Sequence, residues 1–574
     1  MDSSTKEFPL LQSITSLDNH SYLQNELTSI YFQLHRCHDP FKIRTLYSHI
    51  LEVLNFLKKK SSDLSYRKYI KLLFCMIPQS RDVIYGKGEH DISYLLILAF
   101  YSFQPSLSIY ALHRLVTPVT PNSHLFGSWR DIKHLCLFVK QYSIEKEEHP
   151  LISHAIHLVN NQLYNDINTY KFSPHCFSKQ HISNVAKWIP REKNNKFAWL
   201  YDKLAFHWAS QFKSYLFNNI DTPIQKQKAM NKAKKIYRKQ FAFLNKQLHT
   251  TEVLLTQQKY DLIDPADIQM QTLVHQTRLF DPSENQDKQR FTDKLNSHFE
   301  TSFQPQEQFL YKHDFRNVNH ISLGFLVKYA HQAIQNNNLK LQLFIDKLWN
   351  KTNILIPHYQ KDFFIPVVDV SLTATENNYE SLYSSLGLAI MLSQNSNVHN
   401  RIIAMDSLPT WITWDDHTTF TQKVSLFFHT ISSCQSTLPL YDTVLDLISY
   451  GLTNSGASNY FTKNINIVFF STFSNDPIPP SFLQSVETYF QAYAKSPKVT
   501  FWNTSINGGL STFPFSNVSD RAIYMSGFST SVLRQFIKIN KKTINKPKNA
   551  FEYIEQMCCL PYYDCFTTYL SQHL

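Results

Sequence analysis

The hydrophobic pattern of the chain changes its period near Lys361, and this change constrains the fold more than any other feature. Before it, apolar residues recur every three or four positions, as in the segment 44–59, which is the spacing of one helix face. After it, short apolar runs of strand length alternate with helix-like stretches. The pattern predicts a multidomain protein, with an all-α scaffold over residues 1–355 and an α/β domain over residues 356–574.

The N-terminal part is predicted to be an array of helices. Besides the segment 44–59, helices are expected at about 66–77, 91–102, 107–115, 129–141, 150–163, 196–216, 225–249 and 318–349. Their spacing is typical of stacked helix pairs in a solenoid, although no exact repeat is present. The polar segment 257–300 is predicted to be a loop or a poorly ordered insertion.

The C-terminal part is predicted to be a doubly wound sheet. Strands are expected at 363–370, 401–406, 465–472, 498–503 and 521–528, with helices at 380–394, 440–452 and 480–494 and a helical tail. Alternating strands and helices predict a mainly parallel sheet that is covered on both faces. Ligands of such sheets bind at the carboxyl ends of the strands, near a topological switch point.

Positive charge is concentrated in the N-terminal part. The whole chain has a net charge of +12. Residues 366–574 contain 12 Lys and Arg against 14 Asp and Glu, which leaves +14 on residues 1–365. The helical part is therefore the candidate for binding a polyanion.

The most basic segment is the predicted helix at 225–249. One apolar stripe is formed by Met230, Ala233, Tyr237, Phe241, Leu244 and Leu248, and basic residues lie off this stripe. No Asp or Glu occurs between Thr222 and Thr251, so the positive charges repel one another unless an anionic partner is bound. The alternatives are a solvated lysine-rich face and, less favoured, a membrane-surface helix. The best candidates for phosphate contacts are Lys232, Lys234, Lys235, Arg238 and Lys239.

Three smaller clusters pair basic residues with aromatic residues or glycine. They lie at 81–91, 127–136 and 184–200, and such pairs can offer phosphate contacts beside stacking surfaces. The tryptophans of these clusters, Trp129, Trp188 and Trp199, are of a residue type that is more often part of the core. The secondary candidates for RNA binding are Lys87, Arg130, Lys133, Lys187 and Arg191.

An ordered series of segments resembles one family. The series is YGKGEHD, GSWRDIKHL, VAKWIPREKNNKFAWLYDKLA, AKKIYRKQFAFLNKQL, PVVDVSLTAT, SLGLAIMLSQ, TFWN and MSGFS. It looks like a family of uncharacterised proteins that is similar to the TROVE-module proteins, typified by the Ro ribonucleoprotein. The resemblance implies HEAT-like helical repeats that bind noncoding and misfolded RNA as a ring, with a von Willebrand factor A-like domain joining the ends.

The same resemblance implies a metal site that this chain has partly lost. Metal-binding A domains use an Asp-x-Ser-x-Ser loop, a Thr and a later Asp. Here Asp369, Ser371 and Thr373 fit the loop and Thr437 fits the second position, whereas Ser471-Thr472-Phe473 stands where the family resembles Ser-Asp-Met. Asp476 follows at the wrong spacing. Losing a carboxylate weakens a Mg²⁺ site, so we expect either no cofactor or weakly bound Mg²⁺ at a degenerate site.

Catalytic motifs are not found in the sequence, which has no GxSxG, Walker, HExxH or CxxC pattern. The eight scattered cysteines are expected to be reduced thiols. We find neither a signal-peptide pattern nor an apolar run long enough to span a membrane. The sequence thus predicts a cytoplasmic, non-enzymatic, RNA-binding scaffold of a ribonucleoprotein. Two alternatives remain, a protein-interaction adaptor that acts through the A-like domain and a structural component of a virion or granule.

Overall fold

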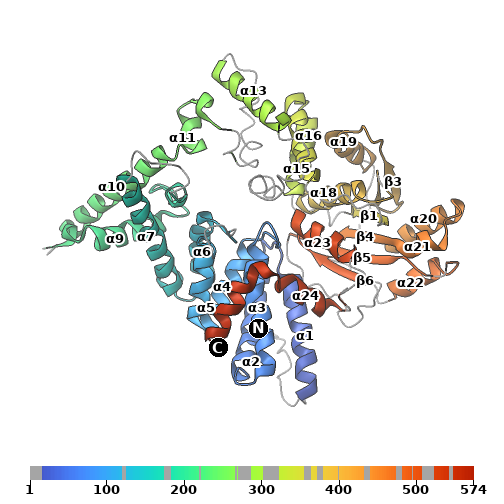
Figure 1. Cartoon of the computed structure of the whole chain (residues 1–574), viewed down its shortest axis with the longest axis horizontal. Helices are drawn as coiled ribbons and strands as arrows, with labels where there is room; N and C mark the ends of the chain where they lie inside the picture. Colours follow the sequence, from blue (N-terminus) through green and yellow to red (C-terminus); the bar gives the residue numbers. More distant parts are fainter. Residues whose placement is uncertain are drawn as a thin grey trace, which may run out of the picture.

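The structure is a computed structural model of the chain. It describes residues 16–118, 125–172, 182–218, 222–264, 268, 286–301, 322–354, 363–371, 379–398, 400–431, 440–473, 481–493, 495–506, 522–541, 547 and 549–573. It consists of an α-helical array followed by an α/β domain (Figure 1). This is the fold class that the change of hydrophobic period predicts.

The helical array occupies the N-terminal part. Its helices are α1 (Ser16–Gln33), α2 (Pro40–Lys59), α3 (Leu64–Arg81), α4 (Asp91–Phe103), α5 (Pro105–Arg114), α6 (Trp129–Tyr142), α7 (Pro150–Phe172), α8 (Val185–Trp188), α9 (Ala198–Phe212), α10 (Pro223–Gln247), α11 (Thr251–Thr256), α13 (Gln286–Thr301), α15 (Leu323–Gln335) and α16 (Leu339–Ile354). Short 3₁₀ turns lie at η1 (Lys146–Glu148), η3 (Ser214–Phe217) and η4 (Tyr260–Leu262). Successive helices pack on one another, for example α2 and α3 on α4, and α9 on α10.

Two sequence predictions differ from this array. The single helix expected at 318–349 is two helices, α15 and α16, because the chain turns at Asn336–Asn338, where Asn337 has a φ of 50°. Asparagine tolerates this left-handed conformation better than most residues. The segment expected to be a loop over 257–300 contains η4 and most of α13, so its polar composition marks a largely exposed helix there.

The α/β domain contains a six-stranded sheet. Its strands are β1 (Phe363–Asp369), β2 (Arg401–Met405), β3 (Thr410–Thr413), β4 (Ile465–Ser471), β5 (Lys498–Asn503) and β6 (Ala522–Ser526), in the spatial order β3-β2-β1-β4-β5-β6. All neighbours are parallel except β2 and β3. The strand β3 was not predicted, because it is short and has only one buried residue. The order reverses direction between β1 and β4, which makes this the switch point of the sheet.

Helices cover both faces of the sheet. They are α18 (Glu380–Gln394), α19 (Phe420–Ile431), α20 (Tyr441–Asn454), α21 (Asn459–Asn464), α22 (Phe482–Tyr489) and α23 (Thr530–Lys541). Phe469 of β4 contacts aromatic rings of α20 and α22, at 5.4 and 5.8 Å between ring centroids. Its neighbour Phe470 contacts Trp502, which packs on Phe536 of α23. Successive strand residues therefore point to opposite covered faces.

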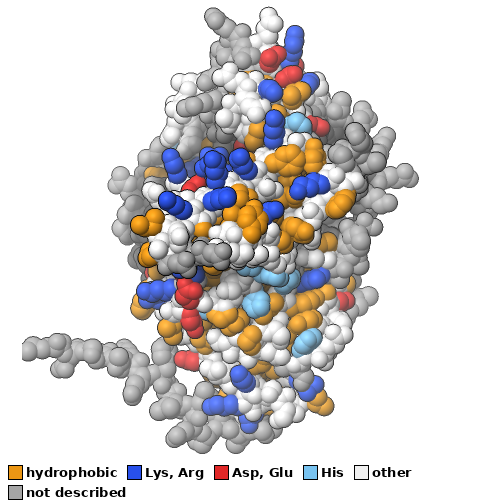
Figure 2. Space-filling view, turned by 90° about the vertical axis from the view of Figure 1, so that its left-hand side faces the viewer, with side chains coloured by type: hydrophobic (Ala, Val, Ile, Leu, Met, Phe, Trp, Pro, Cys, Tyr) orange, Lys and Arg blue, Asp and Glu red, His pale blue; other side chains and the backbone are white. Residues whose placement is uncertain are grey.

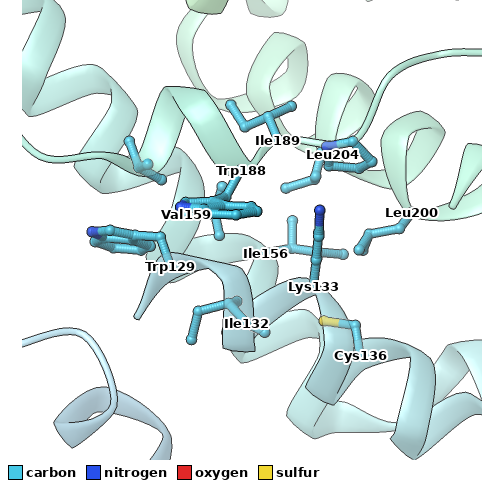
Figure 3. Close-up of a pocket in the computed structure, with 13 residues that line it drawn as sticks. Trp129, Ile132, Lys133, Cys136, Ile156, Val159, Trp188, Ile189, Leu200 and Leu204 are labelled. Atoms are coloured by element: carbon cyan, nitrogen blue, oxygen red, sulfur yellow. The ribbon is translucent and has the colours of Figure 1, made fainter. Parts of the chain in front are cut away.

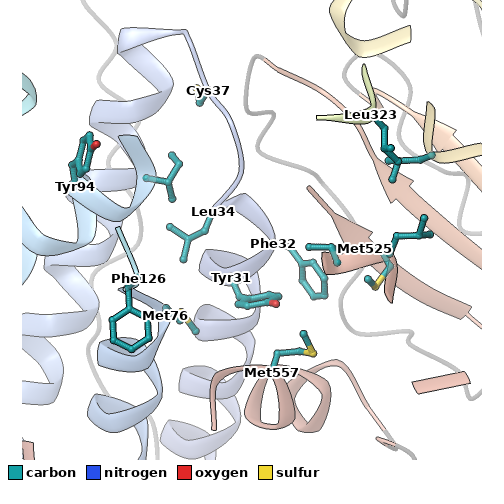
Figure 4. Close-up of a cluster of buried hydrophobic side chains, with 14 of the residues drawn as sticks. Tyr31, Phe32, Leu34, Cys37, Met76, Tyr94, Phe126, Leu323, Met525 and Met557 are labelled. Carbon is teal, nitrogen blue, oxygen red and sulfur yellow. The ribbon is translucent and has the colours of Figure 1, made fainter. Parts of the chain in front are cut away.

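The end of the described chain returns to its beginning. The helices α24 (Ala550–Cys558) and α25 (Asp564–His573) pack on α1 and α3 rather than on the sheet (Figure 1). The Tyr563 hydroxyl donates to Asp82 Oδ2 at 3.2 Å, and the Tyr110 hydroxyl donates to the carbonyl of Cys565 at 3.0 Å. Figure 4 shows Tyr31 and Phe32 of α1 between Met525 of β6 and Met557 of α24. The two parts of the protein share one hydrophobic core.

The opposite end of the array is also joined to the α/β domain. Helix α15 packs on α18 through two glycines, Gly324 and Gly387. A Cβ atom at Gly387 would lie 2.8 Å from the side chain of Leu323, so only glycine permits this approach. The boundary predicted near residue 355 stays a prediction, and the helical tail assigned to the C-terminal domain belongs by its contacts to the first helices.

No helix within the described ranges is both long and apolar enough to cross a bilayer. The six cysteines that the structure describes, Cys37, Cys75, Cys136, Cys558, Cys559 and Cys565, are all free thiols.

Candidate nucleic-acid interface

Helix α10 is fixed to the array by its apolar stripe. Thr222 and Gln225 form a capping box at its first turn, and Pro223 occupies the first helical position. Ala233, Tyr237 and Leu244 are buried, as the spacing predicted. The Tyr237 hydroxyl donates to Asn160 Oδ1 of α7 at 2.9 Å, which orients α10 on its neighbour.

The lysines of α10 that face away from the array form one line, which we call the lysine stripe. It consists of Lys228, Lys232, Lys235, Lys239 and Lys246, all of them exposed. At a rise of about 1.5 Å per residue the stripe is roughly 27 Å long. None of these ammonium groups has an acidic partner among the residues that the structure describes. Within the described part of the chain, the stripe therefore presents positive charge that no carboxylate compensates.

Figure 2 shows this face of the molecule, with Lys and Arg side chains gathered beside hydrophobic ones. Lys232, Lys235 and Lys239 are the predicted candidates that belong to the stripe. Lys228 and Lys246 were not among the candidates, although their spacing from Lys232 and Lys239 places them on the same face of the helix.

Two other predicted candidates are paired with carboxylates. Lys234 Nζ lies 2.6 Å from Asp202 Oδ1 of α9, and Arg238 lies 3.2 Å from Glu192. The Lys234 side chain is also mostly buried, with 17% exposed. These acids come from other elements, so their absence from the α10 sequence does not leave Lys234 and Arg238 unpaired. Both contribute less free charge than the stripe.

A second group of cations surrounds one tryptophan. Arg130, Lys133 and Lys187 lie 5.8, 4.9 and 5.7 Å from the ring centroid of Trp188, within the range of cation–π attraction. Lys187 also pairs with Glu252 at 3.0 Å. Burial, together with the charge of Arg130, lowers the pKa of Lys133. Arg191 is exposed on the following turn.

The pocket beside Trp188 is too small for a ligand. Figure 3 shows Lys133 and Trp188 at its wall with Trp129, Ile156 and Leu200. Its cavity volume is ≈ 20 Å³, room for about one water molecule. Trp129 is itself buried. The pocket is therefore a packing gap, and Lys133 is the one cation of the group that lines it.

Lys87 was wrongly predicted to contact RNA. Its side chain is 2% exposed, and its ammonium donates to the carbonyls of Tyr31 and Leu34 and to the hydroxyl of Ser526. Burial lowers its pKa to about 7. The segment that looked like a basic glycine loop is instead the joint between α1, α3 and β6. Lys87 does not reach a phosphate there, and it leaves the candidate set.

The predicted metal site lies at the switch point of the sheet. Asp369 ends β1 and is fully buried; its Oδ1 accepts from the backbone N–H of Ser371 at 2.9 Å, and its Oδ2 accepts from the hydroxyl of Ser471 at the end of β4. Burial raises the pKa of Asp369, and the charge of Asp406 raises it further. Both oxygens of this carboxylate thus already have protein donors.

The other two predicted ligands, Thr373 and Thr437, lie outside the described residues. Within the described part, no group of three or more His, Cys, Asp or Glu side chains is arranged to hold a metal. The degenerate, weak or empty Mg²⁺ site stays a prediction.

Comparison with known proteins gives distant similarities. No family model matches the chain. It is 22% identical over 471 residues to uncharacterized protein L728 of Acanthamoeba polyphaga mimivirus, covering 79% of this chain and 74% of that protein. The structure is similar to the crystal structure of the RO (RSR) protein of Deinococcus radiodurans, with 8% identity and a TM-score of 0.39, over 90% of this chain and 99% of that one.

Proposed function

We propose that the protein is a non-catalytic RNA-binding scaffold of a ribonucleoprotein, and that the lysine stripe of α10 holds the RNA. The observation that supports this most is the difference between the stripe and its neighbours. Lys234, Arg238 and Lys187 are each paired with a carboxylate, whereas the stripe lysines have no such partner among the described residues. Uncompensated ammonium groups in a line match the charge of a phosphate backbone.

RNA is the polyanion that we favour. The ordered segments that resemble the TROVE-module proteins include the sequence of α10 itself, from Ala233 to Leu248. The cations around Trp188 add a second basic surface on α6 and α8, elements that pack against each other. A structured noncoding RNA is large enough to contact both surfaces. The adaptor and the particle component remain the alternative outcomes of the tests below.

The first test measures how RNA affinity depends on salt. The triple variant Lys232→Gln, Lys235→Gln, Lys239→Gln and the full-length wild type are titrated with a labelled transfer RNA as a structured probe, between about 50 and 200 mM salt. The slope of log K against log salt is negative, and each lost phosphate contact reduces its magnitude by about 0.7 to 0.9. We therefore expect weaker binding and a slope smaller by about 2 to 3 units.

The matched control removes the same charge elsewhere. Lys58, Lys59 and Lys60 are exposed where α2 ends, and their triple Gln variant should bind RNA with nearly the wild-type slope. An unchanged slope in the α10 variant, or an equal loss in both variants, would show that the stripe is not the RNA site.

The second test identifies the partner in native cells. The protein is crosslinked, purified at high salt and analysed for attached RNA and for the crosslinked peptides. We expect noncoding RNA attached to peptides of α6, α8 and α10. Recovery of other proteins without RNA would instead support the adaptor. Recovery of large assemblies of this protein with itself would support the particle component.

A further inference from the structure

One aromatic side chain interrupts the polar surface along the lysine stripe. Phe243 lies four residues after Lys239 and three before Lys246, so on the helix it is a neighbour of both. Its side chain is 38% exposed. Its ring meets Tyr170 of α7 at 5.0 Å between centroids and an interplanar angle of 82°, an edge-on geometry that holds the ring in place.

The two flanks of the stripe differ in chemistry. With about 100° between successive residues of a helix, Phe243 falls on one side of the stripe, and Lys234 and Arg238 fall on the other. The second side brings the carboxylates of Asp202 and Glu192 close to the surface. Because each of those carboxylates neutralises a cation, this flank attracts phosphates less than the stripe does, and the flank of Phe243 is the one that offers a ring to a base.

Further exposed rings lie on the helices that support α10. Phe206 of α9 is 44% exposed and contacts Phe217 at 5.3 Å, and Tyr164 of α7 is 41% exposed and stacks on Phe212 at 4.3 Å. Hydrophobic side chains stand beside the basic ones on the face in Figure 2. Aromatic rings beside a line of cations are the arrangement that binds single strands, because unpaired bases stack on the rings while phosphates follow the charges.

We propose that the stripe binds single-stranded RNA, with its phosphates along Lys232, Lys235 and Lys239 and an unpaired base stacked on Phe243. The inference rests on the proposed function and narrows it. In a duplex the bases are stacked on one another and paired, so they cannot reach the ring. Charge alone favours the duplex, because it has the denser phosphate array. A preference for the single strand would therefore indicate that bases stack on the ring, and charge attraction alone would not explain it.

The experiment uses one labelled RNA strand without self-complementarity, either alone or annealed to its complement. Binding of both forms to the full-length protein is measured by fluorescence anisotropy for the wild type and for Phe243→Leu, which keeps an apolar side chain. We expect the wild type to bind the single strand more tightly. We expect Phe243→Leu to lose at least about five-fold in affinity for the single strand, with unchanged duplex affinity and an unchanged salt slope.

Two variants control for misfolding and for general loss of surface aromatics. Phe243→Tyr retains the ring and should bind the single strand like the wild type. Tyr450→Leu removes a ring that is 68% exposed on α20 of the α/β domain and should change neither affinity. Thermal unfolding of Phe243→Leu at the wild-type temperature confirms that the fold is intact.

The outcomes separate this inference from the proposed function. A wild-type preference for the duplex, or a Phe243→Leu variant with unchanged or equally reduced binding of both forms, overturns the single-strand inference. If the stripe variant still loses affinity and salt dependence in that case, the proposed function stands. Binding of neither form by the wild type overturns both.

Discussion

At the scale of the residue, burial and tertiary ion pairs decide which charges are available, and a sequence shows neither. Lys87 follows a glycine in a basic segment, which favours an exposed loop, yet carbonyls of Tyr31 and Leu34 more than 50 residues away bind its ammonium. Lys234 forms its ion pair with Asp202, which belongs to a different helix, α9. Lys232, Lys235 and Lys239 were predictable, because helical spacing alone places them opposite the apolar stripe.

The ion pair of Arg81 and Asp131 is the most buried one that we find in the described part of the chain. Arg81 donates two hydrogen bonds of 2.8 Å to the carboxylate, and the Tyr94 hydroxyl donates a third. Asp131→Asn leaves the guanidinium buried without its counter-ion, which costs about 3 to 5 kcal/mol. Urea denaturation should show this loss. Asp202→Asn, which breaks the more exposed pair with Lys234, should cost at most about 1 kcal/mol.

The contribution of Asp131 depends on pH in a known direction. Burial alone raises the pKa of a carboxyl group, but the charge and hydrogen bonds of Arg81 outweigh it here and hold the pKa of Asp131 well below its usual range. Its stabilising effect is complete above the unfolded pKa of roughly 3.9 and declines as the pH falls through the lower folded pKa. The difference in unfolding free energy between wild type and Asp131→Asn should be constant near neutral pH and narrow below about pH 4. A difference that grows on acidification would contradict this assignment.

At the scale of the element, hydrophobic period located most helices and strands, and it failed where composition and burial diverge. The break between α15 and α16 depends on a left-handed asparagine inside an otherwise helical pattern. Helix α13 has a polar sequence with few buried residues, so it resembles a loop in composition. Strand β3 has only four residues and only one of them is buried, so it is too short to show an alternation of buried and exposed residues in the sequence.

The lysine stripe should lower the stability of its own helix. Lys228, Lys232, Lys235 and Lys239 are like charges at three- and four-residue spacing, and each such pair destabilises a helix by about 0.2 to 0.5 kcal/mol. The triple Gln variant of the stripe should therefore unfold at a slightly higher temperature than the wild type in low salt, although it binds RNA more weakly. Added salt should remove this difference. An unchanged or lower unfolding temperature would mean that the stripe lysines have partners in the folded protein.

At the scale of the whole molecule, the chain closes on itself, and this closure was implied by the family resemblance but by no local pattern in the sequence. The contacts that make it join residues that lie hundreds of positions apart, such as Lys87 with Ser526 and Asp82 with Tyr563. Each segment is apolar enough to be a core element, but no local pattern identifies its partner. The degenerate metal site expected at the switch point rests on the resemblance alone, and it stays a prediction because part of it lies outside the described residues.

The closure predicts that the first helices and the tail open together. Tyr563→Phe removes a buried hydroxyl that donates to Asp82, which costs about 1 kcal/mol. Hydrogen exchange should become faster by the same factor in α1, α3, α24 and α25, because they form one packed unit, and should stay unchanged in α10. Tyr460→Phe, which alters an exposed ring, is the control. Faster exchange confined to α25 would show that the tail is only loosely attached.

The same closure has a consequence for biosynthesis. The apolar face of α1, with Tyr31 and Phe32, is covered by β6 and α24, which are synthesised long after α1. Lys87 and its partner Ser526 are 439 residues apart, which corresponds to about 20 to 90 s of translation at 5 to 20 residues per second. Throughout that interval the nascent chain exposes the uncovered apolar face of α1, so its synthesis should depend on chaperones that shield this face until β6 and α24 have been made.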